Sequence, residues 1–248
     1  MKDILQDIVS HTHSLGLTLI KVSTDSNATK ITALSDTKSV LLYGETHQRV
    51  DEFDGVFGMG HLEKLSLHLK NPEYQEDPTI EVVRETEEDG TVFPAFVHFE
   101  NMLGDFQNDY RFLNYKIVDK QVKNYKFKGA TWDLDFEPSV SSIARMKLMS
   151  AVHSEEDTFV AKTNNNNLIF SFGDKNNHAS EYVFKSNVTG KLKSERAYPI
   201  AEVQAILSLS GDKSMQISSE QGAMQITLDS GLITYEYIIP VSTKWILI

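Results

Sequence analysis

Imidazole and ammonium groups recur at helical spacing in residues 60–70. His61, Lys64 and His68 follow one another at intervals of three and four, which predicts one helix face, while the leucines of the segment lie on the other face. Groups arranged in this way attract anions such as phosphates. The same pattern is typical of the solvated face of an ordinary amphipathic helix, and the segment alone does not separate the two interpretations.

Three other segments with helical periodicity also contain cations. Residues 2–13 begin with Lys2, and the segment after Ser139 contains Arg145 and Lys147. The segment that begins near Pro199 is followed by Lys213. The number of cations differs from one helix to the next, so these segments predict weak electrostatic contacts rather than a strongly basic patch.

Other motifs do not complete a chemical site. His11 and His13 are two positions apart, so a helix directs them to different faces, and no third residue at matching spacing completes a zinc site. The glycines of GVFGMG (residues 55–60) match neither phosphate-binding loop pattern. The chain has no GxSxG motif. We therefore expect no metal, no cofactor and no catalytic residue.

Composition restricts the class of protein. The 248 residues include no cysteine, which excludes disulfides and thiolate metal sites and favours the cytoplasm as the compartment. The first residues lack the pattern of a signal peptide, and no apolar stretch approaches the length of a membrane span. The net charge of −11 opposes nucleic-acid binding unless the cations are gathered on one surface.

The periodicity predicts an α+β fold. Helices are expected over about residues 2–13, 60–70, 140–150 and 199–211, and alternating segments between them predict strands. A shift of about 141 residues places Leu5 and Ile8 on Met146 and Met149, and the same shift places Leu62 and Leu65 on Val203 and Ile206. We therefore predict two similar domains, 1–118 and 119–248. The segment 114–128 joins them as an extended connector or a strand.

The last part of the chain resembles a known family. The run AEVQAILSLSGDKSMQISSEQGAMQITLDSGLITYEYIIPV (residues 201–241) is similar to the closing unit of DNA sliding clamps, the polymerase processivity factors. The turn Glu88-Asp89-Gly90 and the strand Trp132–Phe136 before the third helix are similar to those of tailed-phage clamps. Proliferating cell nuclear antigen (PCNA) belongs to the same family. Two features depart from it: no strand precedes the first helix, and an apolar tail, Trp245–Ile248, follows the expected end.

The resemblance implies an architecture and a set of site residues. Each domain packs two helices on antiparallel sheet, and three copies form a closed ring whose helices face double-stranded DNA. Unpaired strands near Asp109–Leu113 and Glu181–Ser186 would join the copies, unless these strands are interior ones. The residues predicted to face DNA are Lys2, His61, Lys64, His68, Arg145, Lys147 and Lys213.

The resemblance also implies partner proteins. A DNA polymerase would insert a peptide into a pocket formed by Tyr115, Ile117 and Val118 with Ile239 and Pro240, and a separate clamp loader would open the ring. Such a protein performs no bond chemistry and, if viral, acts in the host cytoplasm. Two other classes fit the composition: a small α+β hydrolase that uses Asp and His residues, and a structural virion protein.

Overall fold

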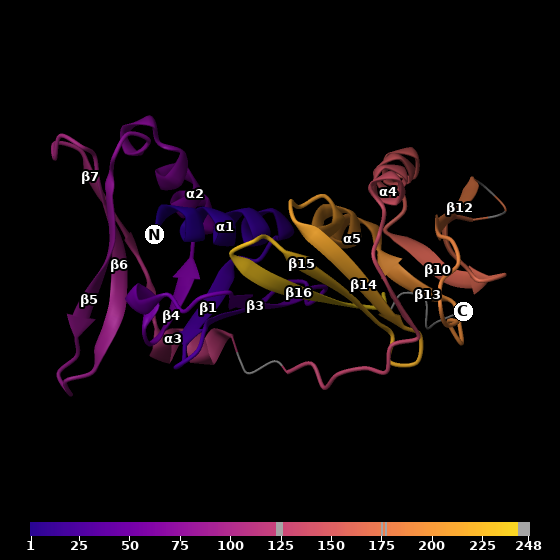
Figure 1. Ribbon diagram of the computed structural model, residues 1–248, viewed down its shortest axis with the longest axis horizontal. Helices are drawn as coiled ribbons and strands as arrows, with labels where there is room; N and C mark the ends of the chain where they lie inside the picture. Colours follow the sequence, from indigo (N-terminus) through magenta and orange to yellow (C-terminus); the bar gives the residue numbers. More distant parts are fainter. Residues whose placement is uncertain (123–125, 175, 177, 243–248) are drawn as a thin grey trace. The chain divides into compact units, whose positions relative to one another are not determined.

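The computed structural model describes residues 1–122, 126–174, 176 and 178–242 (Figure 1). The chain divides into two compact units. Unit 1 comprises Met1–Lys126 and Ser230–Tyr235, and unit 2 comprises Phe127–Asp229 and Glu236–Ile248. The predicted tail Trp245–Ile248 lies outside the described residues.

Unit 1 begins with a helix, four strands and a second helix. These are α1 (Lys2–Thr12), β1 (Leu19–Thr24), β2 (Thr29–Leu34), β3 (Leu41–Thr46), β4 (Val56–Gly60) and α2 (Leu62–Lys70). There follow β5 (Thr79–Thr86), β6 (Val92–Glu100), β7 (Gln107–Arg111), β8 (Leu113–Asn114) and α3 (Tyr115–Gln121). Short 3-10 turns lie at His13–Leu15, Asp51–Phe53 and Pro72–Tyr74.

The strands of unit 1 form two antiparallel groups. One has the order β8-β4-β1-β2-β3, and the other has the order β5-β6-β7. Helices α1 and α2 contact each other, and their apolar stripes, which include Leu5, Ile8, Leu62 and Leu65, are buried. Burial of these stripes supplies the main driving force for the helix layer.

Unit 2 repeats the order of elements. It contains β9 (Leu134–Phe136), α4 (Val140–Val152), β10 (Thr158–Asn164), β11 (Asn167–Gly173), β12 (Ala179–Lys185), β13 (Arg196–Pro199) and α5 (Ile200–Leu207). It closes with β14 (Asp212–Ser218), β15 (Ala223–Asp229) and β16 (Ile233–Pro240), whose first three residues belong to unit 1. The strand orders are β12-β11-β10-β13 and β16-β15-β14-β9.

Helices occur at all four predicted positions. Ser139 caps α4 by accepting a hydrogen bond from the Ser142 backbone N–H at 3.1 Å. Met146, Val203 and Ile206 are buried at positions that correspond to Leu5, Leu62 and Leu65. The fold is therefore α+β with two similar sets of elements.

The prediction of an extended or β connector was wrong for residues 115–121, which form α3. The Asn114 side chain caps this helix by accepting from the Lys116 N–H at 2.9 Å, and Val118 is buried. A Cβ at Gly58 of β4 would lie only 2.2 Å from Val118 Cγ2, so α3 packs where β4 has no side chain. Tertiary packing thus overrides the alternating pattern of lysines and apolar residues.

Candidate nucleic-acid interface

The outer surface of the α1–α2 pair is polar. A hollow of about 360 Å³ lies between these helices, and it is lined by Gln6, Val9, Ser10, His13, Ser14, Ser66, Leu69 and Lys70. The lining contains no carboxylate, and Lys70 and His13 are exposed. Hydroxyl, amide and ammonium groups of this kind make sequence-independent contacts with phosphate oxygens.

The four helices of the two pairs are less acidic than the rest of the chain. Helices α1, α2, α4 and α5 together contain five cations and four carboxylates, a net charge of +1, whereas the whole chain has −11. Helix α4 contains Arg145 and Lys147, both exposed, and no carboxylate. The negative charge is therefore concentrated outside these helices, which is the segregation that a DNA-facing surface requires.

Of the three residues predicted to share one face of α2, His61 and Lys64 are exposed and His68 is partly buried. Its ring stacks on Phe99 at a centroid distance of 5.3 Å, and its burial, together with the nearby Lys64 ammonium, lowers its pKa. His61 precedes α2 in the left-handed conformation, with φ 54°, and its exposed ring lies 3.5 Å from Glu63. Of the three residues, Lys64 is the one that is both exposed and within the helix.

The ammonium groups of Lys2 and Lys213, two further residues predicted to face DNA, donate hydrogen bonds within the chain. Lys2 Nζ donates to the Tyr74 carbonyl at 2.8 Å and to Gln75 Oε1 at 2.9 Å. Lys213 Nζ donates to the carbonyls of Leu209 and Gly211 just beyond α5. Burial lowers the pKa of Lys213.

The exposed cations of these helices are thus Lys64, Lys70, Arg145 and Lys147, and within the described part of the chain none of them is in an ion pair. Lys70 was missed at the sequence level because it lies at the last position of α2, outside the three-and-four spacing of the other basic residues.

One carboxylate of α1 is withdrawn from the surface. Asp7 Oδ2 accepts hydrogen bonds from Ser230 Oγ at 2.9 Å and from the Tyr235 hydroxyl at 2.8 Å, and the His11 ring lies 3.3 Å from Asp7 Oδ1. Burial opposes ionisation of Asp7, but the hydrogen bonds from His11, Tyr235 and Ser230 outweigh it and lower its pKa. The network fixes α1 to residues 230–235 while it keeps this negative charge off the exposed helix face.

The five residues predicted to form the pocket differ in their exposure. In unit 1, Ile117 is 45% exposed on α3, Tyr115 is half-buried and Val118 is buried. In unit 2, Ile239 is buried and Pro240 is exposed at the end of β16. Val118 and Ile239 are core residues of their own units. Their part in a peptide pocket stays a prediction.

The two strands proposed for ring closure lie at sheet edges. Among the described residues, β7 pairs only with β6, and β12 pairs only with β11. Leu113 and Asn114, at the end of the first predicted edge, instead pair with β4 as β8. Both strands are therefore edge strands that another strand can extend, as β5 and β13 are at the opposite edges of the same two sheets.

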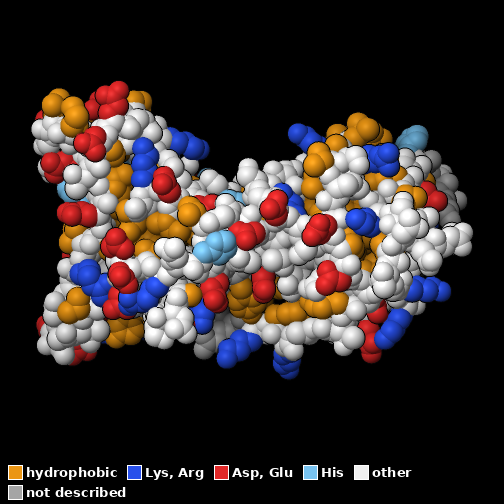
Figure 2. All heavy atoms as spheres, viewed as in Figure 1, with side chains coloured by type: hydrophobic (Ala, Val, Ile, Leu, Met, Phe, Trp, Pro, Cys, Tyr) orange, Lys and Arg blue, Asp and Glu red, His pale blue; other side chains and the backbone are white. Residues whose placement is uncertain are grey.

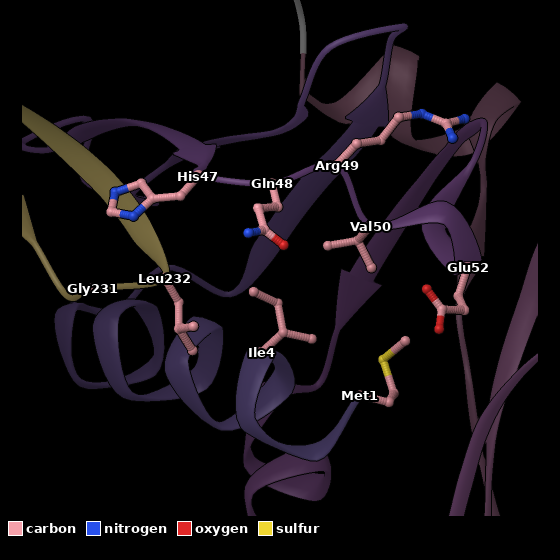
Figure 3. A pocket seen from close by; sticks show the side chains of 9 residues that line it. All are labelled: Met1, Ile4, His47, Gln48, Arg49, Val50, Glu52, Gly231 and Leu232. Atoms are coloured by element: carbon pink, nitrogen blue, oxygen red, sulfur yellow. The ribbon is translucent and has the colours of Figure 1, made fainter.

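A hollow of about 440 Å³ in unit 1 bears on the hydrolase alternative (Figure 3). Met1, Ile4, Val50 and Leu232 supply apolar walls, and Arg49 is directed away from them, toward Asp51 and Asp54. The ring of His47 lies 3.1 Å from Thr234 Oγ1. No serine, threonine, tyrosine or cysteine lines this hollow, and its titratable lining residues are His47, Arg49 and Glu52.

Across the described residues, no group of three or more His, Cys, Asp or Glu side chains is arranged to hold a metal ion. In the same part of the chain, no helix has the length and apolar character needed to cross a membrane.

Comparison with known proteins identifies the fold. No protein-family model and no curated protein sequence matches the chain. Two PCNA structures match almost the whole of it. One is A. fulgidus PCNA with the C-terminal region of FEN-1 bound, which has a TM-score of 0.69 and 7% identity over 97% of this chain and 96% of that chain.

The second is PCNA from Thermococcus kodakaraensis, with a TM-score of 0.69 and 11% identity over 96% of this chain and 97% of that one. The chain has the fold of a PCNA-type sliding clamp subunit. The resemblance read from residues 201–241 and the predicted α+β class are confirmed. The identities of 7% and 11% show the fold and leave function to be argued from the site.

Proposed function

We propose that this protein is a sliding clamp that encircles duplex DNA and tethers a replicative polymerase, and that it performs no bond chemistry. The observation that carries the proposal is the match to PCNA over nearly the full length of both chains. The charge distribution supports it, because the clamp-type helices have a net charge of +1 in a chain of −11.

We propose that three copies close the ring head to tail through the β7 and β12 edges. The hole would hold DNA by weak contacts from Lys64, Lys70, Arg145 and Lys147, which permits sliding because no base is read. Opening the ring requires a loader. We place the protein in the cytoplasm, that of the host if it is viral.

We propose that partner proteins bind an exposed apolar side chain of α3. Ile117 supports this, because it is 45% exposed on a helix whose other apolar residue, Val118, is buried. Ile117→Glu should weaken stimulation of a polymerase and leave assembly unchanged, since the side chain is not part of the core. Stimulation equal to that of the unmodified protein would exclude α3 as the docking site.

The test of the clamp function is retention on DNA. Mass in solution is measured by light scattering, and the protein is loaded onto nicked circular DNA by a clamp loader and challenged with salt before and after the circle is cut. A trimer that stays on circles and leaves linear DNA supports the proposal. Equal loss from both forms, or a monomer at all concentrations, rejects it and favours the virion-protein or hydrolase alternative.

A further inference from the structure

The hollow of unit 1 in Figure 3 combines apolar walls with a polar rim, and we call it the Leu232 hollow. Its walls come from the start of α1, the loop between β3 and β4, and the turn between β15 and β16. The apolar members are Met1, Ile4, Val50 and Leu232. Leu232 is 42% exposed, although turns favour polar residues. Its volume of about 440 Å³ and its apolar walls are typical of a binding site.

Hydrogen bonds hold the three walls of the Leu232 hollow in place. The His47 backbone N–H donates to the Leu232 carbonyl at 2.9 Å, which joins the loop to the turn. Ser230 Oγ donates to Asp7 Oδ2 at 2.9 Å, which joins the same turn to α1. The walls are therefore fixed before a ligand arrives, and binding to them costs little conformational entropy.

Two polar side chains at the rim have no partner among the described residues. The Gln48 amide makes no hydrogen bond there, and the Glu52 carboxylate forms no ion pair. Figure 3 shows the Gln48 amide directed toward Ile4, and it shows the Glu52 carboxylate beside Met1. An unpaired amide can both donate to and accept from a peptide backbone, whereas a carboxylate accepts from a cation.

The loop that forms one wall is acidic. Residues 47–55 contain one arginine and three carboxylates, a formal net charge of −2 with His47 neutral. Arg49 is paired with Asp51 and Asp54, so Glu52 is the carboxylate of this loop whose charge is not offset. At the place of the N-terminus in Figure 1, Figure 2 shows hydrophobic side chains bordered by acidic ones. A partner complementary to this rim carries positive charge beside an apolar group.

We propose that the Leu232 hollow binds a cationic peptide segment of a partner protein. One apolar side chain of the segment enters the hollow, a neighbouring lysine or arginine pairs with Glu52, and the Gln48 amide bonds the peptide backbone between them. All lining residues belong to unit 1, so the site does not depend on ring closure. It is distinct from the partner site proposed at α3, because the hollow precedes the start of β16 whereas Pro240 ends that strand.

The test uses methyl NMR spectra of the full-length protein, because every apolar wall residue has a methyl group. The probes are capped tetrapeptides with one leucine or phenylalanine between lysines. They should shift the methyl signals of Ile4, Val50 and Leu232 with half-saturation at about 1 mM, as expected for one apolar side chain and an exposed ion pair. Peptides with alanine in place of the apolar residue, or with glutamate in place of lysine, should bind about fivefold more weakly.

Two variants separate the apolar contact from the charged one. Leu232→Ser should weaken binding of the leucine peptide about fivefold, and Val92→Ser is its matched control, because Val92 is likewise exposed. Glu52→Gln should weaken binding of the lysine peptide about two- to fivefold and should not change binding of an analogue with glutamine in place of lysine. Glu88→Gln, at an exposed carboxylate of the β5–β6 turn, should change neither. Urea unfolding confirms that each variant remains folded.

Three outcomes would overturn the proposal. Methyl signals of the hollow that do not move at about 10 mM peptide would show that no such segment binds there. Equal binding of the lysine and glutamate peptides would show that Glu52 does not select a cationic partner. Shifts of the same signals when the protein alone is concentrated would place a second copy of the chain, rather than a separate partner, in the hollow.

Discussion

The α1–α2 pair of unit 1 and the α4–α5 pair of unit 2 bury apolar side chains at corresponding positions, yet they present different surfaces. The first pair exposes a polar hollow with Lys70 and His13, and the second exposes apolar side chains of α4 such as Leu148 together with Arg145 and Lys147. Packing on a sheet requires only the buried side of each helix. The exposed side is free to differ, and we propose that it contacts DNA in both units.

The largest expected effects are in the shared core. Leu65→Ala and its counterpart Ile206→Ala should each lower the free energy of unfolding by about 2–5 kcal/mol, because both side chains are fully buried and truncation leaves a cavity. Urea denaturation measures both. A loss below about 1 kcal/mol at one site alone would show that the two helix pairs are not packed alike.

Helix α3 has no counterpart among the described elements of unit 2, and substitution of Gly58 tests how α3 is held. Gly58→Ala should cost about 3 kcal/mol, because its Cβ would lie 2.2 Å from Val118 Cγ2. Hydrogen exchange should show loss of protection in residues 115–121. The double variant with Val118→Ala should recover part of the lost stability. An equal loss in the single and the double variant would show that Val118 is not the source of the strain.

The hydrogen bonds of Asp7 distinguish α1 from α4, because the corresponding position of α4 is the exposed Leu148. Asp7→Asn should cost about 1–2 kcal/mol at neutral pH by weakening bonds to a charged acceptor. The folded pKa of Asp7 is lowered, so its contribution is fully present above the unfolded value of about 4 and is lost as the pH falls through the folded pKa.

Acid unfolding followed by circular dichroism checks this sign. Asp7→Asn should flatten the pH dependence of stability below about pH 4. Asp3→Asn is the control, since Asp3 is an exposed carboxylate of the same helix. An equal change in both variants would mean that net charge, rather than the network, sets the acid response.

The smallest effects on stability are expected at the lysines that we propose to face DNA. Lys64→Ala with Lys70→Ala should change the free energy of unfolding by less than about 0.5 kcal/mol, because both side chains are exposed. The dependence of log affinity for duplex DNA on log salt should become shallower by about 0.9 for each lost phosphate contact. Lys191→Ala, another exposed lysine, should leave that slope unchanged.

The sequence was sufficient for the helices because each has an apolar stripe, and the offset of about 141 residues located both pairs. It did not predict β4, because the glycines in VFGMG resemble a loop, whereas Gly58 is there to admit Val118. Nor did it predict α3, whose helix depends on the Asn114 cap and on contact with β4. Both errors concern segments whose structure is decided by distant neighbours.

The exposure of the residues predicted to face DNA could be predicted for some of them and not for others. Helix periodicity located Lys64, Arg145 and Lys147, which are exposed. It did not predict that the ring of His68 stacks on Phe99 of β6. Lys2 is likewise bound by the Tyr74 carbonyl, 72 residues away. Helix spacing identifies which residues share a face, but the neighbouring elements decide whether that face reaches solvent.

The bond between the Asp7 carboxylate and the Tyr235 hydroxyl joins residues 228 positions apart. Since a ribosome makes the chain from the N-terminus, α1 emerges long before its final partners, residues 230–235. Unit 1 therefore cannot complete its fold until nearly all of unit 2 has been synthesised. During that interval the incompletely covered surface of unit 1 can bind chaperones. The contacts that complete unit 1 join residues far apart in the sequence, and such contacts form slowly.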